Sequence, residues 1–341
     1  MSRKPDPTQR PTLRTVAEIS GLAVTTVSRA LADDPKIAAK TRARVAEIAR
    51  QVGYTPDRAA QRLRTGKTRV ITLILDGTQE RIRFGSTVIS GLTRALQGTD
   101  YHLTVTPHFH ADDSQGTVQN IVRNNLADGL VFSRVKPFDE RVRFLSERGF
   151  PFACHGRTEF SRPHPFVDFD NEAFANMAAN RLIDAGVRRI CMIMPSERFT
   201  FHQHLNYGLM RAVRQHGVDY VIPQEITLDS SLDEINAWAQ AIAAAPDRPD
   251  GFICPGEAAY IALMSGLRAA GLERGRDFCA VVKASSRLLK QIEPRVDVIY
   301  EDIEEAGFLL GQHVLAAINT PDAPPEQTIQ KPLADLGQKP G

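Results

Sequence analysis

The chain has 341 residues, 42% of them hydrophobic, which is enough for two or three domains with packed cores. It contains no run of about 18 apolar residues, and no apolar segment follows its basic start, so we expect a cytoplasmic protein without a membrane span or secretory signal. The four cysteines lie far apart and lack the CxxC spacing of zinc and redox sites. We therefore predict no metal site and no cofactor, and we expect reduced thiols in the core.

Positive charge is concentrated at the start of the chain. Residues 1–66 hold 13 Lys and Arg against 6 Asp and Glu, a net charge of +7, whereas the rest of the chain has a net charge of −5. Clustered positive charge raises the affinity for a polyanion, because binding releases condensed counterions. This pattern favours a nucleic-acid partner, and the alternative is a solvated basic face on an ordinary domain.

Helical spacing of apolar residues predicts three short helices in this basic region. The second helix follows the first after three or four residues that include Gly21, and such a short turn with a glycine is typical of a helix-turn-helix. Thr12 is a suitable cap for the first helix, and Gly53 ends the third. The helices are expected at about 12–20, 24–32 and 39–51.

The remainder of the chain alternates apolar strands with helical segments. Continuous apolar strands between helices imply parallel sheets covered on both faces. Two consecutive series of this kind imply two doubly wound lobes, with a small-molecule cleft outside the carboxyl ends of the strands. The predicted strands are VITLIL, HLTVTP, GLVF and FPFACHG in the first series and RICMIM, GFICP and FCAVVK in the second. The predicted helices lie around 88–96, 118–125, the segment up to 148, 174–185, 205–216, 233–245 and 258–270.

These motifs together resemble the LacI/GalR family of bacterial transcription regulators. The headpiece resemblance covers residues 12–64 and rests on VAEISGL, TTVSRAL, KTRARV, GYTPDRAAQRL and their spacing. The remainder resembles the family's periplasmic-binding-protein-like domain through ADGLVF, VDFDNEAF, RLIDAGVRRI and PDGFICPG. The resemblance implies an N-terminal all-α helix-turn-helix headpiece, followed by an α/β two-lobed domain with two doubly wound parallel sheets.

The function implied by the resemblance is that of a sequence-specific DNA-binding transcriptional repressor, and not of an enzyme. A small molecule of the sugar class would modulate its binding to operator DNA. The protein would act as a homodimer on a near-palindromic operator, because a dyad relates the two half-sites. Whether the effector releases the protein from DNA or strengthens its grip stays open. The segments CHGRTE, VDFDNEAF and VVKASS are similar to the branch of the family that controls α-glucoside uptake genes in alphaproteobacteria.

The resemblance also implies the domain boundaries. We expect a flexible arm at 1–11, a helix-turn-helix DNA-binding domain at 12–57, a hinge helix or linker at 58–66, and an effector-binding and dimerisation domain at 67–341. Within the last domain, we expect one lobe to comprise roughly 67–168 plus 300–323 and the other 169–299 plus 324–341.

The second helix of the headpiece is the expected recognition helix, whose N-terminal residues reach base edges in the major groove first. By resemblance, the base-reading residues are Val24, Thr25 and Arg29. Arg29 can donate two hydrogen bonds to guanine O6 and N7, and its alternative role is a surface salt bridge. The residues expected to bind phosphates, with helix capping as the alternative, are Thr15, Thr26, Ser28, Lys36, Thr41 and Arg42.

The segment after Pro56 has few apolar residues and is similar to the family's hinge, which folds into a helix when two subunits meet over the operator. Leu63 would enter the minor groove at the central step and kink the DNA, or else cover a neighbouring hydrophobic patch. The basic hinge residues expected to follow the phosphates or the groove floor are Arg58, Arg62 and Arg64.

Sugar sites combine guanidinium donors, carboxylate acceptors and an aromatic ring that covers the apolar face of the sugar. All three kinds of side chain occur near the ends of the predicted strands, where an ordinary surface role is the alternative for each. The chain departs from the common family pattern at Leu205, Gly256 and Lys283, so the usual ribose or galactose contacts are not expected. The candidate effector-binding residues are Arg83, Phe84, Arg134, Arg157, Asp170, His202, His204 and Glu257.

Two other functions fit parts of the sequence. A free-standing sugar receptor shares the two-lobed architecture, but it would need a signal peptide and no basic headpiece. An enzyme would need a catalytic constellation, and the pairs His108 with His110 and His202 with His204 are better explained by strand alternation or polar loops. The TGKT segment at 65–68 lacks the first glycine of a phosphate loop. The tail has no leucine heptads, which favours a dimer over a tetramer.

Overall fold

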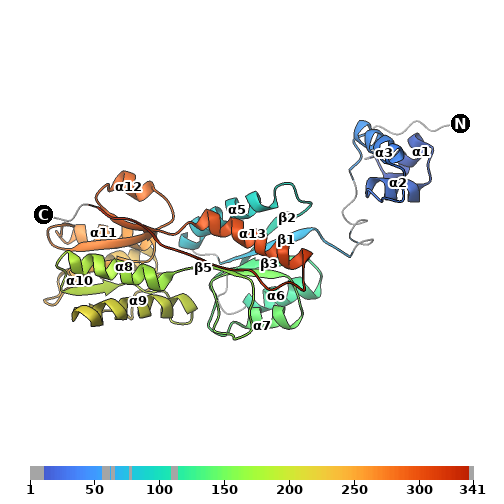
Figure 1. Cartoon of the computed structure of the whole chain (residues 1–341). Helices are drawn as coiled ribbons and strands as arrows, with labels where there is room; N and C mark the ends of the chain where they lie inside the picture. The colour runs from blue at the N-terminus through green and yellow to red at the C-terminus, as the bar shows by residue number, and fades with distance from the viewer. Residues whose placement is uncertain (1–10, 56–61, 63–65, 77–78, 109–113, 338–341) are drawn as a thin grey trace. The chain divides into compact units, whose positions relative to one another are not determined.

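The computed structural model describes residues 11–55, 62, 66–76, 79–108 and 114–337 (Figure 1). The chain divides into two compact units, Met1–Thr68 and Arg69–Gly341. The boundary lies within two residues of the predicted end of the hinge. Each unit has its own hydrophobic core.

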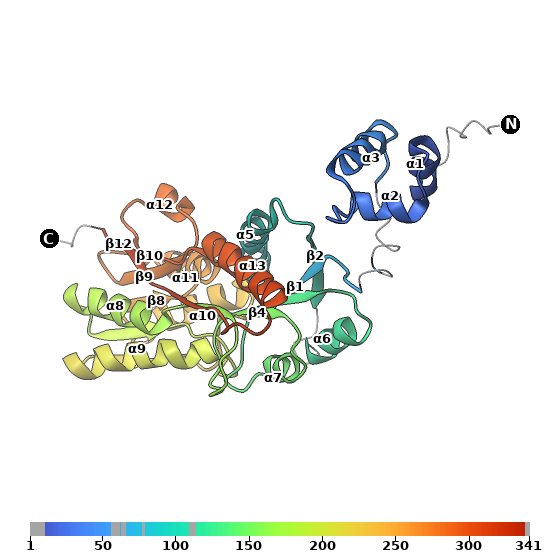
Figure 2. The ribbon, with the colours of Figure 1, turned by 45° about the vertical axis from the view of Figure 1, so that its right-hand side comes forward.

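The described residues 11–55 of the first unit form three helices (Figure 2). The first helix is capped by Thr12, whose hydroxyl accepts from the backbone of Thr15, and it ends at Gly21 in a left-handed conformation with φ 69°. Three fully buried valines, one from each helix, meet in the core. The helices are α1 Leu13–Ser20, α2 Val24–Leu31 and α3 Ala39–Gln51, which confirms the helix-turn-helix prediction.

The first lobe of the second unit contains a six-stranded sheet in the order β11-β5-β4-β3-β1-β2, with every neighbouring pair parallel. Helices α5 and α13 cover one face, and α6 and α7 cover the other. The strands are β1 Val70–Asp76, β2 His102–His108, β3 Gly129–Phe132, β4 Phe152–His155, β5 Phe166–Phe169 and β11 Gln327–Gln330. The helices are α5 Gln79–Leu96, α6 Ser114–Arg123, α7 Glu140–Glu147 and α13 Ile303–Asn319.

The second lobe repeats this architecture with the order β12-β10-β9-β8-β6-β7, in which only the β10–β12 pair of the described strands is antiparallel. Helices α8 and α9 cover one face, and α10 and α11 cover the other. The strands are β6 Arg189–Met192, β7 Asp219–Val221, β8 Gly251–Cys254, β9 Cys279–Ala284, β10 Asp297–Tyr300 and β12 Leu333–Asp335. The helices are α8 Asn171–Asp184, α9 Thr200–His216, α10 Leu232–Ala243, α11 Glu257–Ala269 and the short α12 Leu288–Ile292.

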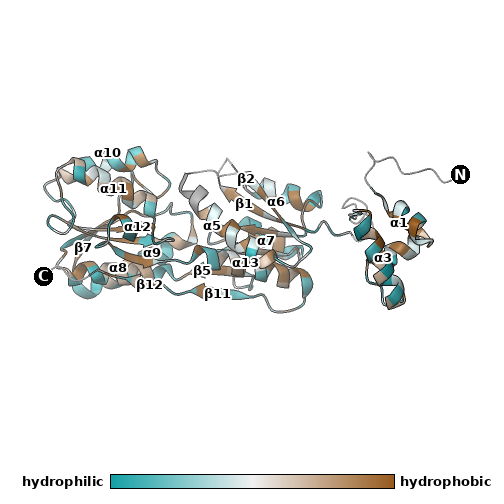
Figure 3. Ribbon diagram, turned by 90° about the horizontal axis from the view of Figure 1, so that it is seen from above, coloured by the Kyte–Doolittle hydropathy of each residue, from teal (hydrophilic) through white to brown (hydrophobic). Residues whose placement is uncertain are grey.

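Apolar strands lie at the centre of each lobe, between helices that carry hydrophilic outer turns (Figure 3). This is the arrangement that continuous apolar strands predict, because both faces of each sheet are buried. The predicted strands all form, and the predicted helices form with longer N-terminal parts in α5, α6 and α9.

The C-terminal segment differs from the prediction that placed 324–341 in the second lobe. β11 pairs in parallel with β5 of the first sheet, and Phe166 N donates to Glu326 O at 3.1 Å. β12 then joins the second sheet beside β10. The chain therefore crosses between the lobes after β5, after β10 and after β11. The short strands β11 and β12 carry half-exposed, mixed side chains, so their sequence gave no apolar signal.

Candidate functional site

The exposed face of α2 is the candidate DNA-reading surface. Val27 and Ala30 turn into the headpiece core, so the opposite side of this helix faces solvent. Val24, at the first position of the helix, is 42% exposed, and Thr25 and Arg29 are also exposed. The helix begins at Ala23 without a side-chain cap from the described residues, which leaves backbone N–H groups at its N-terminus open to an anion.

Arg29 makes a surface ion pair, which is the alternative to base contact that the sequence predicts for it. Its Nε lies 2.8 Å from Asp34 Oδ2, and both side chains are partly exposed. Such a pair contributes at most about 1 kcal/mol to stability, so it can open at little cost when a base edge is offered.

The predicted phosphate-binding residues divide into two groups. The Thr15 hydroxyl belongs to the capping box of α1, where it accepts from Thr12 N at 3.1 Å. Arg42 holds the turn between α2 and α3, because Nη1 donates to Ile37 O at 2.6 Å and Nε lies 2.7 Å from Asp33. Lys36 is exposed, while Thr26, Ser28 and Thr41 are half-buried.

The capping alternative holds for Thr15 and fails for Thr41. Helix α3 begins at Ala38 with no side-chain cap among the described residues, and Thr41 lies in its first turn. Of the predicted hinge residues, Arg62 is described as exposed and helical. Arg58, Leu63 and Arg64 lie outside the described residues.

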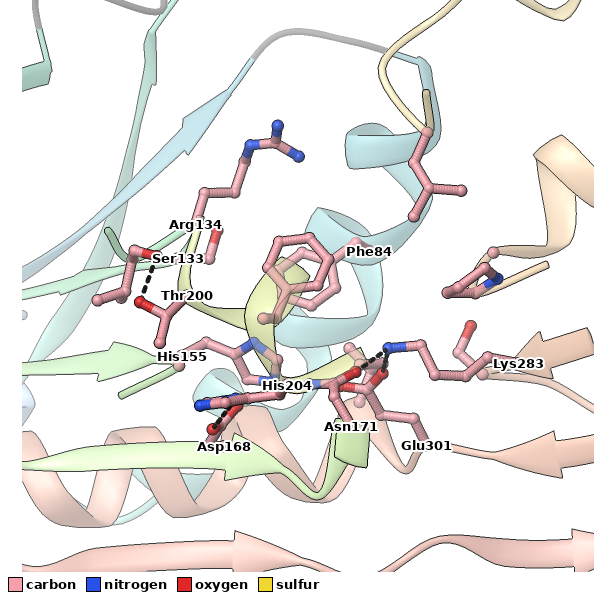
Figure 4. A pocket seen from close by; sticks show the side chains of 18 of the residues that line it. Phe84, Ser133, Arg134, His155, Asp168, Asn171, Thr200, His204, Lys283 and Glu301 are labelled. Atoms are coloured by element: carbon pink, nitrogen blue, oxygen red, sulfur yellow. Dashed lines mark hydrogen bonds and ion pairs between the residues drawn. The ribbon is translucent and has the colours of Figure 1, made fainter. Parts of the chain in front are cut away.

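The second unit contains a cavity of about 210 Å³ between its two lobes (Figure 4). Its walls come from the carboxyl ends of β1, β3, β4, β5, β8, β9 and β10, from α5 and from the starts of α8, α9, α11 and α13. This is the position that two doubly wound sheets predict for a ligand. The predicted effector residues that line it are Phe84, Arg134, Arg157, His204 and Glu257.

Two predicted effector residues have other roles in the described structure. Asp170 caps α8, where its side chain accepts from Ala173 N at 2.9 Å. The ring of His202 points to the backbone, with Nδ1 2.8 Å from Pro195 O. Neither residue is part of the cavity wall as described. The side chain of Arg83 lies outside the described structure.

A buried charge cluster forms the floor of the cavity. Lys283 Nζ lies 2.6 Å from Glu301 Oε2 and donates to Asn171 Oδ1 at 3.2 Å. His155 Nε2 lies 3.4 Å from Glu301 Oε1. Burial raises the pKa of Glu301, but the charges of Lys283 and His155 outweigh burial and bring it down to about 2. The Glu301 carboxylate is therefore ionised at neutral pH and stays paired with Lys283.

A second corner of the cavity joins β4, β5 and α9. Arg157 Nε lies 3.2 Å from Asp168 Oδ2, and His204 Nδ1 lies 3.9 Å from the same oxygen. Asp168 is 2% exposed, and burial raises its pKa to about 6. Burial and the neighbouring Arg157 lower the pKa of His204 to about 4, so its imidazole is neutral at pH 7.

The third corner connects the two lobes. Arg134, which follows β3, binds both carboxylate oxygens of Asp229 at 2.6 and 2.8 Å, and its guanidinium stacks 4.0 Å from the centroid of Phe199. Thr200, the first residue of α9, donates its backbone N–H to Val135 O at 2.9 Å. Each contact joins the first lobe to the second across the cavity mouth.

Several cavity residues were missed by the sequence analysis. VDFDN offers two aspartates two residues apart: Asp168 on β5 lies in the cavity wall, whereas Asp170, the predicted effector contact, follows the strand and caps α8. Lys283 was noted as a departure from the family pattern, which was the available signal for it. The full set of missed polar residues comprises Ser133, His155, Asp168, Asn171, Thr200, Asp229, Lys283, Ser285 and Glu301.

The described residues give no support to the rival sites. They contain no group of three or more His, Cys, Asp or Glu side chains placed to hold a metal ion. His202 and His204 point to different partners, and His110 is outside the described chain. No described helix is long and apolar enough to span a membrane.

A helix-turn-helix headpiece together with a two-lobed ligand-binding domain defines a ligand-responsive transcription regulator. The profile of "Bacterial regulatory proteins, lacI family" matches residues 12–57, and that of "Periplasmic binding protein-like domain" matches residues 179–335. HTH-type transcriptional regulator AglR from Rhizobium meliloti (strain 1021) is 30% identical over 328 residues, which cover 93% of this chain and 90% of AglR. The chain belongs to the LacI family of DNA-binding transcription regulators and is not an enzyme.

Solved structures agree with this fold. The lac repressor dimer bound to operator and the anti-inducer ONPF matches 97% of this chain and 99% of its own, with a TM-score of 0.81 and 15% identity. The transcriptional regulator CelR–cellobiose complex matches 97% of this chain and 100% of its own, with a TM-score of 0.69 and 21% identity.

Proposed function

We propose that the protein is a homodimeric, cytoplasmic repressor whose affinity for a near-palindromic operator is controlled by a sugar bound in the interlobe cavity. The observation that carries the effector part is the cavity wall, which combines Phe84 with guanidinium, imidazole and carboxylate groups from both lobes. A ligand that contacts both lobes can change their relative orientation, to the extent that it binds one orientation more tightly than the other.

The headpiece surface supports the DNA part of the proposal. Val24, Thr25 and Arg29 are the proposed base readers, because they are exposed on the open face of α2. Lys36 and the uncapped starts of α2 and α3 are the proposed phosphate contacts. Thr15 and Arg42 would contribute chiefly by holding the headpiece in shape, since both side chains are engaged in internal contacts.

The proposed effector is a sugar, with an α-glucoside as the first class to test. The similarity of CHGRTE, VDFDNEAF and VVKASS to the α-glucoside branch supports the choice of an α-glucoside, and the CelR complex with cellobiose, a β-linked disaccharide, supports a sugar effector in general. The proposed effector contacts are Phe84, Arg134, Arg157, His204 and Glu257, to which the cavity wall adds Asp168 and Lys283. We place the headpiece at 12–57, the hinge at 58–66 and the sensor at 67–341.

A mobility-shift titration tests the proposed function. The purified protein is mixed with the DNA upstream of its own gene, with and without maltose, trehalose, sucrose and a monosaccharide panel. We expect specific binding that one sugar changes by about tenfold or more, which corresponds to a coupling free energy of about 1.4 kcal/mol. Specific binding that no sugar changes would refute the effector assignment and leave the operator assignment intact. A free-standing sugar receptor would bind sugar without binding DNA.

A further inference from the structure

We propose that the interlobe cavity selects an uncharged sugar, held by a hydroxyl group between Asp168 and His204, and rejects the phosphorylated or carboxylated forms of the same sugar. This inference rests on the proposed sugar-sensing function and specifies its ligand. Two features of the cavity carry it: the pairing of its charged side chains and the unused hydrogen-bonding capacity at one corner.

Every cationic Lys or Arg side chain described in the cavity wall already has a carboxylate partner. Arg134 lies 2.6 Å from Asp229 and Lys283 lies 2.6 Å from Glu301. Arg157 lies 3.2 Å from Asp168. An anionic ligand would have to displace a protein carboxylate from one of these pairs, and the displaced carboxylate would then stand in a confined cavity without its partner.

The carboxylates of the described cavity wall also oppose an anion. Among the described lining residues, three Lys and Arg face four Asp and Glu, the fourth carboxylate being Glu257. Glu257 accepts from the hydroxyls of Ser286 at 3.1 Å and Ser285 at 3.3 Å, and these hydrogen bonds stabilise its negative charge. A phosphate or carboxylate on the ligand would add negative charge beside these carboxylates, and like-charge juxtaposition at an interface weakens binding.

The corner at Asp168 and His204 is suited to a hydroxyl group. Asp168 Oδ2 and His204 Nδ1 are both buried atoms with no hydrogen-bond partner among the described residues. Their separation of 3.9 Å is too long for a direct hydrogen bond, whereas a single hydroxyl oxygen can lie within bonding distance of both. A hydroxyl can donate to the carboxylate and bond to the imidazole at the same time. Buried polar atoms are normally satisfied, so these two atoms mark the place of a polar ligand group.

Titration calorimetry on the full-length protein tests the selection with three matched pairs: maltose, sucrose and trehalose, each against its own 6-phosphate ester. We expect the neutral member of at least one pair to bind and its phosphate ester to bind at least about 100-fold more weakly. A phosphate ester that binds as tightly as its neutral sugar would overturn this inference and leave sugar sensing intact. If no member of any pair binds, the proposed sensing of these sugars and the inference fail together.

Two variants test the two features separately. Asp229→Asn removes the charge that neutralises Arg134, so we expect the discrimination against the phosphate ester to shrink by about tenfold or more. Asp247→Asn is the matched control, because Asp247 pairs with Arg189 at 3.0 Å on the surface of the same lobe, outside the cavity wall as described. The Asp247→Asn variant should discriminate between the neutral sugar and its phosphate ester as strongly as the wild type does. Unchanged discrimination in Asp229→Asn would contradict the pairing argument.

Asp168→Asn tests the hydroxyl anchor. The amide has nearly the shape of the carboxylate but loses its charge, so we expect the affinity for the neutral sugar to fall by about 10- to 100-fold. Sugar-free operator affinity and the unfolding temperature report whether the variant still folds, and His204→Asn provides a second variant at the same corner. Wild-type sugar affinity in both folded variants would refute the anchor.

Discussion

Asp168 and His204 show how burial sets the chemistry of single residues in the cavity. Burial raises the pKa of Asp168 to about 6, even though the charges of His155 and Arg157 act in the opposite direction. Burial and the charge of Arg157 lower the pKa of His204 to about 4. At pH 7 the corner therefore presents an ionised carboxylate and a neutral imidazole. The carboxylate can accept a hydrogen bond from a sugar hydroxyl, and the imidazole can donate or accept one.

We expect the affinity for the neutral sugar to fall as the pH is lowered through about 6, because protonation removes the charge from the acceptor Asp168. This fall in sugar affinity does not come from a loss of fold stability when Asp168 is protonated. A carboxyl whose pKa is higher in the folded state than its ordinary 3.8 stabilises the fold as it protonates, so its contribution to stability rises as the pH falls from about 6 toward 3.8. Calorimetry between pH 7.5 and 5.5 measures the effect, and Asp168→Asn should flatten it. An equal pH dependence in that variant would assign the effect to another group.

Arg29 provides a residue-scale prediction for DNA recognition. We expect Arg29→Ala to weaken operator binding by about 1–3 kcal/mol and to relax the preference at one base pair of each half-site. The fold should be little affected, because the pair with Asp34 is on the surface. Binding to the operator and to single-base variants measures both effects.

Arg50→Ala is the matched control for this experiment. It removes the same charge from an exposed headpiece arginine that pairs with Glu47 and belongs to α3 rather than to α2. The control should weaken binding to every sequence to a similar, smaller extent. Equal losses in Arg29→Ala for the operator and for all its base variants would show that Arg29 contacts phosphate rather than a base.

The sequence could predict cavity-lining residues where residue type and strand end coincide, as at Arg134 and Arg157, and also Phe84 in the helix that follows β1. It could not identify partners that other parts of the chain supply. Glu301 follows β10, which the sequence analysis did not predict, and the value of Glu301 to the site comes from Lys283 on the neighbouring strand. Asp168 and Asp170 are only two residues apart in the sequence, but β5 ends at Phe169, so Asp168 is a strand residue in the cavity wall and Asp170 caps α8.

Among the helices and strands, the sequence predicts those whose own residues carry local signals. Helix α1 has a capping box and ends at a turn glycine, and all three helices α1 to α3 carry periodic apolar residues, so the sequence predicts their bounds to within about one residue. Helix α13 was not identified as a helix, although it packs along α5 and completes the cover of the first sheet. Its role depends on the chain's return from the second lobe, which no local pattern encodes. The strands β11 and β12 depend in the same way on their long-range partners.

The contact between α5 and α13 gives a prediction about packing. Gly91 on α5 and Gly307 on α13 allow the two backbones to approach closely, since a Cβ at Gly91 would overlap the backbone of Glu304 and Phe308. We expect Gly91→Ala to destabilise the protein by about 1–3 kcal/mol, despite the roughly 1 kcal/mol by which alanine favours a helix. Urea unfolding measures this.

Ser90→Ala is the control for the helix contact, because Ser90 is the adjacent exposed residue of the same helix. We expect its stability to equal or slightly exceed that of the wild type. If Gly91→Ala were also as stable as the wild type, the two helices would have to separate without cost, and close packing between them would not hold the first lobe together.

At the scale of the whole molecule, the sensor lobes are joined by polar contacts rather than by a continuous core. Arg134 with Asp229 and Thr200 with Val135 span the cavity mouth, and each lobe keeps separate hydrophobic clusters on the two faces of its sheet. Polar contacts of this kind can be exchanged for ligand contacts, so the orientation of the lobes can respond to a bound sugar at modest free-energy cost.

Thermodynamic linkage then gives a prediction that involves both units of the chain. If a sugar changes operator affinity by some factor, operator DNA must change sugar affinity by the same factor, because the coupling free energy is reciprocal. We expect a coupling of about 1–3 kcal/mol, or roughly 5- to 150-fold. Calorimetric titration of the sugar into free protein, into the protein–operator complex and into protein with scrambled DNA of equal length measures it. Equal sugar affinities in all three titrations would mean that the cavity and the headpiece are energetically independent, and operator control would then have to come from a ligand bound elsewhere.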